Sequence, residues 1–334
     1  MTVLVTGGAG YIGSVVAAEL LNAGRRVLVY DDLSRGHRRA IPKGAELIVA
    51  DTADRAALDR VFKTHTVDAV MHFAALIEAG ESMKNPAAFF RNNTANSLML
   101  LEAMLAHGVK KFVFSSTAAL FGNPERSPIE EDDPLRPTNV YGESKLMVER
   151  MLAWLNDIHG LRYASLRYFN AAGAVSADHG EDHRPESHLI PLVLKVALGR
   201  IEHVNIMGAD YPTPDGTCVR DYIHVLDLAS AHLLALDALE RRDRLIYNLG
   251  NGQGFSVREV IEVARKITGR PIPVVESPRR PGDPAILIAS AARIRRELNW
   301  RPQFPDLETI VASAWRWHHA HPYGYGDDTG SVTH

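Results

Sequence analysis

Short apolar runs alternate with longer amphipathic segments through the first half of the chain. Six runs have the length of buried strands: residues 3–5, 27–30, 47–49, 69–73, 112–114 and 164–166. The segments between them carry apolar residues at helical spacing, most clearly at 15–21, 87–106 and 141–158. This alternation predicts an α/β fold, a doubly wound parallel sheet with helices on both faces, over residues 1–175.

The regular alternation fades after residue 175. The stretch 176–187 is polar and acidic, which predicts a surface loop, and helical patterns recur at 226–239 and 257–268. We therefore expect a smaller mixed α/β substrate-binding domain over 176–322, with some later strands interleaved with the first domain. The segment 323–334 lacks periodicity, and we expect a frayed tail there.

The composition excludes several classes of protein. Among 334 residues, Lys and Arg number 37 and Asp and Glu 40, a formal net charge of −3. No basic excess therefore favours nucleic acid or an anionic membrane surface as a partner. No apolar stretch reaches the roughly 18 residues that a membrane helix needs. The N-terminus lacks the basic region of a signal peptide, so we expect a soluble, cytoplasmic protein.

Cysteine and histidine usage gives little support for a metal centre. The single cysteine, Cys218, excludes an intrachain disulfide and zinc sites built from several thiolates, and we expect a buried structural thiol. His318, His319 and His321 lie close together, but carboxylates or cysteines at ligand spacing are missing around them. We expect a solvated helix end there and no metal site.

A glycine-rich turn follows the first predicted strand. Gly7, Gly10 and Gly13 have the spacing that permits a tight turn and lets a pyrophosphate approach a helix N-terminus. The second strand ends in Asp31 and Asp32, where a carboxylate accepts hydrogen bonds from an adenosine ribose and repels a 2′-phosphate. Glycine turns cap many helices, and loop acids are often merely solvated. In this strand–turn–helix context the pattern indicates a Rossmann-like site for NAD rather than NADP.

A tyrosine and a lysine stand one helical turn apart, at Tyr141 and Lys145. Thr117 follows the fifth strand, at the carboxyl edge where open α/β sheets bind ligands. We predict that Tyr141 transfers a proton, that Lys145 and a bound nicotinamide lower its pKa, and that Thr117 holds a substrate hydroxyl. Ser115 and Ser116 remain ordinary strand-end hydroxyls in this interpretation.

These features occur within motifs found in order along the chain: TGGAGYIGS at 6–14, DDLSRGH at 31–37, HFAALIEAGES at 72–82, NNTANSL at 92–98, SSTAALFG at 115–122, YGESK at 141–145, LRYFNAAGA at 166–174, DYPTPDGTCVRDYIHV at 210–225 and RRPGD at 279–283. Together they resemble the extended short-chain dehydrogenase/reductase family. The resemblance is closest to the UDP-glucose 4-epimerase family and extends to about Tyr323.

The resemblance implies two sets of contacts, by position. Besides the three glycines, Tyr141 and Lys145, the cofactor would touch Tyr11, Ile12, Asp31, Asp32, Leu33, Ser34, Arg35, Gly36, Asp51, Thr52, Phe73, Ala74, Ala75, Leu76, Ile77, Asn92 and Phe169. Besides Thr117 and Tyr141, the nucleotide sugar would touch Asn170, His188, Leu189, Asn205, Ile206, Met207, Arg220, Arg280, Asp283 and Leu287.

Individual members of these sets carry specific expectations. Arg220 and Arg280 suit a diphosphate through bidentate contacts, and their family position favours this role over the alternative of a surface ion pair. Leu287 stands at the expected sugar-size gate, where its bulk would disfavour N-acetylated sugars. Ile77 replaces a lysine, and His188 an asparagine, found in some relatives.

The reaction that the resemblance implies is NAD-dependent, reversible C4 epimerisation of UDP-glucose and UDP-galactose through a 4-keto intermediate. A related alternative is epimerisation of another UDP-sugar: an N-acetylhexosamine, a uronic acid or a pentose. A nucleotide-sugar 4,6-dehydratase is disfavoured, because Ala118 and Ala119 stand where related dehydratases place acids. A non-enzymatic cofactor-sensing regulator would not need the Thr–Tyr–Lys set.

The resemblance also implies a homodimer. In the family, the helices equivalent to 87–106 and 141–158 often pair across a dimer axis as a four-helix bundle. Apolar residues occur on more than one side of these two segments, among them Phe89, Leu98, Leu101, Met147, Met151 and Trp154.

Overall fold

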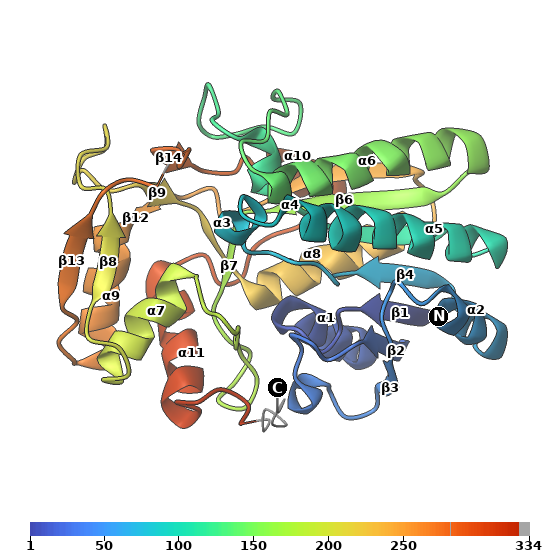
Figure 1. Cartoon of the computed structure of the whole chain (residues 1–334), viewed down its shortest axis with the longest axis horizontal. Coiled ribbons are helices and arrows are strands. Elements are labelled where there is room, and N and C mark those ends of the chain that lie inside the picture. Colours follow the sequence, from blue (N-terminus) through green and yellow to red (C-terminus); the bar gives the residue numbers. More distant parts are fainter. Residues whose placement is uncertain (281, 327–334) are drawn as a thin grey trace.

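The computed structural model describes residues 1–280 and 282–326, and a seven-stranded parallel sheet lies at its centre (Figure 1). The strand order is β11-β6-β5-β4-β1-β2-β3. Their bounds are β1 Thr2–Thr6, β2 Arg26–Asp31, β3 Glu46–Val49, β4 Ala69–His72, β5 Lys111–Thr117, β6 Arg162–Tyr168 and β11 Arg244–Leu249. The six strands predicted for the first half are confirmed, with β4 ending one residue earlier than predicted.

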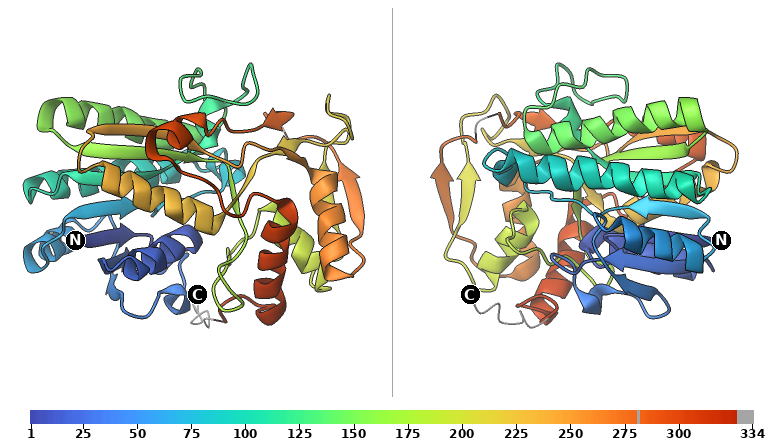
Figure 2. Two further views of the ribbon diagram at one scale, coloured as in Figure 1. Left: turned by 180° about the vertical axis from the view of Figure 1, so that it is seen from behind. Right: turned by 45° about the vertical axis from the view of Figure 1, so that its right-hand side comes forward.

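Helices cover both faces of this sheet, as predicted (Figure 2). Side chains alternate along β1, so that Val3 and Val5 face one core while Leu4 faces the other. The first core is closed by α1 (Tyr11–Asn22) and α8 (Val225–Ala238), and the second by α2 (Arg55–Thr64), α5 (Asn96–Ala106) and α6 (Val140–His159). Burial on both faces explains why the strand sequences are continuously apolar.

Elements from the second half divide between this sheet and a smaller group. The strand β11 and the helices α8 and α10 (Ala292–Leu298) return to the central sheet, as expected for interleaved strands. The boundary expected at residue 175 stays a prediction. The smaller group has its own core and contains α7 Leu189–Ala197, β8 Val204–Met207, β9 Val219–Arg220, β12 Phe255–Ser256, α9 Val257–Thr268, β13 Val274–Ser277, β14 Ile286–Leu287 and α11 Leu307–Ala320. Short connecting elements are η1 Arg38–Ala40, α3 Ala79–Ser82, η3 Ala118–Phe121, β7 Asn170–Ala172 and β10 Tyr222–His224.

The helix predicted over 87–106 is interrupted. It forms α4 (Pro86–Phe89), a wider π-helical segment η2 (Phe90–Ala95) and then α5. Within η2 the Asn93 side chain is buried. Its Oδ1 accepts from the Leu76 N–H at 2.8 Å, and its Nδ2 donates to the Leu76 carbonyl oxygen at 2.9 Å. The irregular turn thus presents an amide to the loop after β4, which periodicity alone does not reveal.

The polar stretch 176–187 is not simply a surface loop, contrary to the prediction. Gly180 and Glu181 are buried, and the Trp317 indole donates to the Glu181 carbonyl oxygen at 2.9 Å. The expected frayed tail is also ordered at its start, because Tyr325 is 5% exposed and packs against Trp317. Residues 327–334 lie outside the described part. Apolar contacts thus bury a stretch whose composition suggested solvent exposure.

The histidines near the end of α11 differ in their exposure to solvent. His319 is exposed, as a solvated helix end requires, but His318 is buried and its neighbour Trp317 is fully covered. The prediction of a solvated helix end is therefore wrong for His318, because this face of α11 packs against the buried part of the 176–187 stretch.

Cys218 is a buried free thiol, as predicted. No helix in the described ranges is long and apolar enough to cross a membrane.

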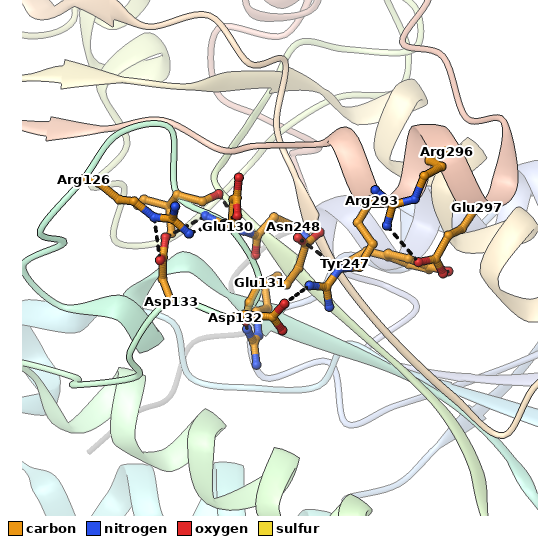
Figure 3. Close-up of polar contacts among 12 residues, drawn as sticks. Arg126, Glu130, Glu131, Asp132, Asp133, Tyr247, Asn248, Arg293, Arg296 and Glu297 are labelled. Atoms are coloured by element: carbon orange, nitrogen blue, oxygen red, sulfur yellow. Dashed lines mark hydrogen bonds and ion pairs between the residues drawn. The ribbon is translucent and has the colours of Figure 1, made fainter.

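The loop between β5 and α6 is fastened to β11 and α10 (Figure 3). Glu131 is buried there, and its carboxylate accepts the Asn248 backbone N–H at 3.0 Å and lies 3.4 Å from Nε of Arg293. The Asn248 side chain donates to the Ile129 carbonyl oxygen at 2.9 Å. These contacts fix the loop that determines how α6 begins beside the end of β5.

Candidate active site

A cavity of about 380 Å³ opens at the carboxyl ends of the parallel strands. Its walls come from the segments that follow β1, β2, β4, β5 and β6 and from the 181–188 segment. This is the edge at which open α/β sheets bind ligands. Candidate residues from distant parts of the sequence meet here because the strands are parallel.

The glycine turn forms a close cradle at one end of the cavity. Gly7 has φ +70°, and a Cβ at this position would overlap the Ala74 backbone nitrogen. A Cβ at Gly13 would overlap the Gly7 carbonyl oxygen. Only glycine permits this approach of the turn, the loop after β4 and the first turn of α1. The cradle suits the pyrophosphate of a dinucleotide, and Gly10, Tyr11 and Ile12 also line it.

Asp31 is held rigidly beside this turn. Its Oδ2 accepts the Ala9 N–H at 2.9 Å and its Oδ1 the Leu33 N–H at 2.8 Å. Burial raises the pKa of this carboxyl group, and the two backbone donors act against that effect. Each carboxylate oxygen retains further acceptor capacity, so the group suits the ribose hydroxyls of NAD.

Most of the residues expected at the cofactor line the cavity. They are Gly7, Gly10, Tyr11, Ile12, Gly13, Asp31, Asp32, Ser34, Arg35, Gly36, Asp51, Thr52, Phe73, Ala74, Ala75, Leu76, Ile77, Asn92, Tyr141 and Phe169. Leu33 and Lys145 do not. Leu33 contributes its backbone N–H to Asp31, and Lys145 lies behind the wall. Contact of these residues with a cofactor stays a prediction.

The predicted catalytic residues converge at the other end of the cavity. Tyr141 and Thr117 line it, and the Thr117 hydroxyl interacts with the phenol. Lys145 is 2% exposed, its Nζ donates to the Ser115 carbonyl oxygen at 2.9 Å, and burial lowers its pKa to about 7. The Ser116 hydroxyl group donates a hydrogen bond to Oε1 of Glu149 at 2.6 Å, and we keep Ser116 outside the predicted catalytic set.

The electrostatics of Tyr141 differ from the expectation. Burial raises the pKa of its phenol, and the charge of Glu78 adds to this, while Thr117 acts in the opposite direction. The protein alone therefore does not produce the low pKa that was predicted from Lys145 and a nicotinamide together. The ammonium group of Lys145 is itself desolvated and donates to a backbone carbonyl oxygen.

Only part of the expected sugar-nucleotide set reaches this cavity. Asn170 and His188 line it, together with Thr117 and Tyr141. The remaining residues, which do not line it, are Leu189, Asn205, Ile206, Met207, Arg220, Arg280, Asp283 and Leu287. Ile206 is 1% exposed and packs in the core of the smaller group, so its side chain cannot face a ligand.

Arg220 pairs with Asp283 at 2.5 Å rather than standing free, and β9 places it opposite Leu287 of β14. Asn170 donates to the carbonyl oxygen of Asp221, the next residue, at 2.9 Å. The backbone next to Arg220 thus contacts a residue of the cavity wall, and Asp283 and Leu287 are neighbours of Arg220. Arg280 is exposed.

The cavity wall also includes residues that the sequence analysis did not select: Tyr30, Ala50, Glu78, Ser115, Ser116, Tyr168, Ala171, Glu181, Asp182, His183 and Arg184. Four of them belong to the stretch that was expected to be a surface loop. The alternation of acids and histidines there, E-x-H-x-x-E-x-H over 181–188, is a signal that could have identified it. The others are residues at or near strand ends and Glu78, which directly precedes α3, and they have no distinguishing pattern.

The acids and histidines of this stretch form one cluster. Glu181 and Glu186 contact both His183 and His188. Burial acts to lower the pKa of each imidazole, but the two carboxylates raise it to about 9 for His183 and about 10 for His188. His183 also meets the Tyr11 ring edge-on, with 6.1 Å between centroids. The cluster thus adjoins the glycine turn.

Comparison with known proteins places this geometry in a family. Residues 3–250 match the NAD dependent epimerase/dehydratase family. A UDP-glucose 4-epimerase of Halalkalibacterium halodurans is 53% identical over 330 residues, 98% of each chain. One of Streptomyces lividans is 53% identical over 327 residues, 97% of this chain and 98% of the other. The structure of the Bifidobacterium longum UDP-glucose 4-epimerase in complex with NAD+ and UDP has a TM-score of 0.93 and 40% identity, covering 97% of this chain and 100% of the other. The chain therefore belongs to the NAD dependent epimerase/dehydratase family.

Proposed function

We propose that this protein catalyses the reversible C4 epimerisation of UDP-glucose and UDP-galactose with bound NAD. The observation that carries the proposal is the placement of Tyr141, Thr117 and Lys145 at one end of a cavity whose other end fits a dinucleotide. Relatives that match nearly the whole chain bear the name UDP-glucose 4-epimerase, which supports the substrate.

The protein residues supply binding and proton transfer. Tyr141 takes the proton of the C4 hydroxyl group, and Thr117 holds that hydroxyl group in line with the phenol. The glycine turn and Asp31 would hold NAD, whose nicotinamide would supply the hydride acceptor and donor for C4. Burial raises the pKa of Tyr141, and a positive nicotinamide bound beside the phenol would favour the phenolate. Cofactor and proton transfer are thus coupled.

Inversion at C4 requires a sugar that turns while its diphosphate stays fixed. His188 and Asn170 lie in the cavity, and Arg220 lies beside its wall with Asp283 as a partner. We propose that Arg220 exchanges this partner for the diphosphate, because a guanidinium group binds phosphate oxygens as well as a carboxylate. Arg280 and Leu287 keep their expected roles at the diphosphate and at the sugar-size gate as parts of this proposal.

Proton NMR of the purified protein with UDP-galactose, first without and then with added NAD, tests the function. UDP-glucose should form, and its formation without added NAD would show that the cofactor is retained and recycled. Absence of UDP-glucose in both samples would exclude this substrate pair. Parallel samples with UDP-N-acetylgalactosamine, a UDP-uronic acid and a UDP-pentose would then distinguish the alternative epimerases.

We also propose a homodimer formed through α5 and α6. Met147, Met151, Trp154 and Ile158 follow one another at helical spacing along α6, and Trp154 and Ile158 are 67% and 66% exposed. The two helices lie side by side on one face of the sheet (Figure 1). An apolar stripe on an outer helix marks a protein interface, and a second copy of the chain fits it.

We also propose that the protein is located in the cytoplasm, which cell fractionation would test.

A further inference from the structure

We infer that Glu181, His183, Glu186 and His188 form a zinc site that fastens the 181–188 segment beside the cavity. The inference does not depend on the proposed function, and it departs from the expectation that the chain has no metal site. The four side chains each offer one ligand atom, and these atoms lie within 4.8 Å of one another. Within residues 1–280 and 282–326, no other group of three or more possible ligands is this compact.

Four separations between the ring nitrogens and the carboxylate oxygens bracket the edge length of a tetrahedral zinc site. Nδ1 of His183 lies 3.1 Å from Oε1 of Glu181 and 3.8 Å from Oε2 of Glu186. Nδ1 of His188 lies 3.2 Å from Oε1 of Glu181 and 2.9 Å from Oε1 of Glu186. Ligands at zinc bond lengths of about 2.0–2.2 Å stand about 3.3–3.6 Å apart in a tetrahedron. Side-chain rotations that bring one ligand atom of each residue, now within 4.8 Å of one another, to this spacing would seat one ion between them.

Hydrogen bonding alone leaves this cluster incompletely satisfied. Nδ1 of His183 is buried and makes no hydrogen bond of acceptable geometry, although a carboxylate oxygen is 3.1 Å away. A buried ring nitrogen close to two carboxylates, yet directed at neither, is suited to a common central ion. Zinc would displace the ring protons that the two carboxylates favour, and the resulting two neutral imidazoles and two carboxylates carry a charge of −2, which Zn²⁺ neutralises.

The surroundings give such an ion a defined role. On one side of the segment, Asp182 lies 3.3 Å from Nε2 of His37. On the other side, the Glu181 carbonyl oxygen accepts a hydrogen bond from the indole of Trp317 in α11. The ion would lock the segment between the central sheet and the smaller group. Coordination through Nδ1 also fixes the tautomer of His188, leaving Nε2–H as a hydrogen-bond donor on a residue that lines the cavity.

Zinc titration of the full chain tests this inference. The protein is prepared without a polyhistidine tag, depleted with a chelator and titrated calorimetrically with ZnCl₂. One Zn²⁺ should bind per chain and raise the melting temperature. The isosteric variant Glu186→Gln and the variant His183→Ala should each weaken binding about 100-fold or more. Circular dichroism confirms that both variants remain folded.

The control variant His319→Ala removes an exposed histidine at the end of α11. It should bind zinc as the unaltered chain does. The inference is overturned if the unaltered chain binds no more tightly than the cluster variants, or if His319→Ala abolishes binding. Because calorimetry and melting temperature do not require turnover, failure here is distinguishable from failure of the proposed function.

Discussion

The ammonium group of Lys145 donates a hydrogen bond to the backbone carbonyl oxygen of Ser115, 2.9 Å away. Ser115 belongs to β5 and Lys145 to α6, so this buried contact locks the helix against the strand end. Tyr141 lies one helical turn before Lys145, and Thr117 lies two residues after Ser115. This contact therefore helps to place the phenol and the Thr117 hydroxyl group at the cavity.

Removing the phenolic hydroxyl group should abolish most of the activity without unfolding the protein. We expect Tyr141→Phe to lower kcat by about 10²–10⁴-fold, because proton transfer at C4 loses its acid/base group. Steady-state rates with UDP-galactose measure this change. Tyr323→Phe, at a 72% exposed tyrosine, is the matched control and should keep full activity. Equal rates for the two variants would remove Tyr141 from the mechanism.

Lys145 should make stability depend on pH above neutrality. Burial lowers its pKa to about 7, from an ordinary value of 10.5. Between these values the unfolded chain binds one more proton, so this group makes stability rise with pH by about 1.4 kcal/mol per unit. Lys145→Met should remove that slope and lower kcat about 10²-fold.

Urea unfolding at pH 7 and pH 9 measures the slope in both proteins. Other groups titrate in this range, so the difference between the two proteins is the informative quantity. Identical slopes would mean that Lys145 is not desolvated in the folded chain.

His72 should contribute to acid sensitivity. Its ring lies between Thr6 Oγ1 at 2.6 Å and Ser97 Oγ at 2.8 Å, and burial lowers its pKa to about 3 from 6.5. The unfolded chain therefore binds more protons between pH 3 and pH 6.5, and stability from this group is lost as the pH falls through that window. In His72→Gln the free energy of unfolding should fall less steeply on acidification, by about 1.4 kcal/mol per pH unit. Unfolding free energies at pH 6.5 and 5.0 test this, and an unchanged slope would contradict it.

The dimer should depend on the stripe along α6. Trp154→Glu places a charge in the proposed interface, and we expect a monomer mass by light scattering at micromolar concentration. The control Ile201→Glu alters an exposed apolar residue outside α5 and α6 and should leave a dimer mass. A monomer mass for the unaltered chain would refute the dimer.

The sequence predicted the sheet and the cofactor end of the cavity well, because both depend on local patterns. Apolar runs define strands, and the glycine turn and Asp31 stand at fixed places in a strand–turn–helix unit. Thr117 and Tyr141 both line the cavity, whereas Lys145 lies behind its wall, and their catalytic roles stay predictions. The role of Asn93 was missed because it depends on a π-helical turn, which has no periodic signature.

The 181–188 segment was missed for a different reason. Its composition is that of a surface loop, and long-range contacts, among them those with Trp317 and Tyr325, bury part of it. The raised pKa of Tyr141 likewise depends on the surrounding packing, which sequence spacing cannot supply. Tertiary burial therefore accounts for both discrepancies.

Incubation with UDP-galactose carrying deuterium at C4 tests the central claim most directly. Proton and deuterium NMR follow the product in ordinary water. We expect UDP-glucose that retains deuterium at C4, because the same hydrogen leaves the sugar and returns to its opposite face. UDP-glucose with a solvent proton at C4, or no UDP-glucose even after NAD is added, would contradict this mechanism.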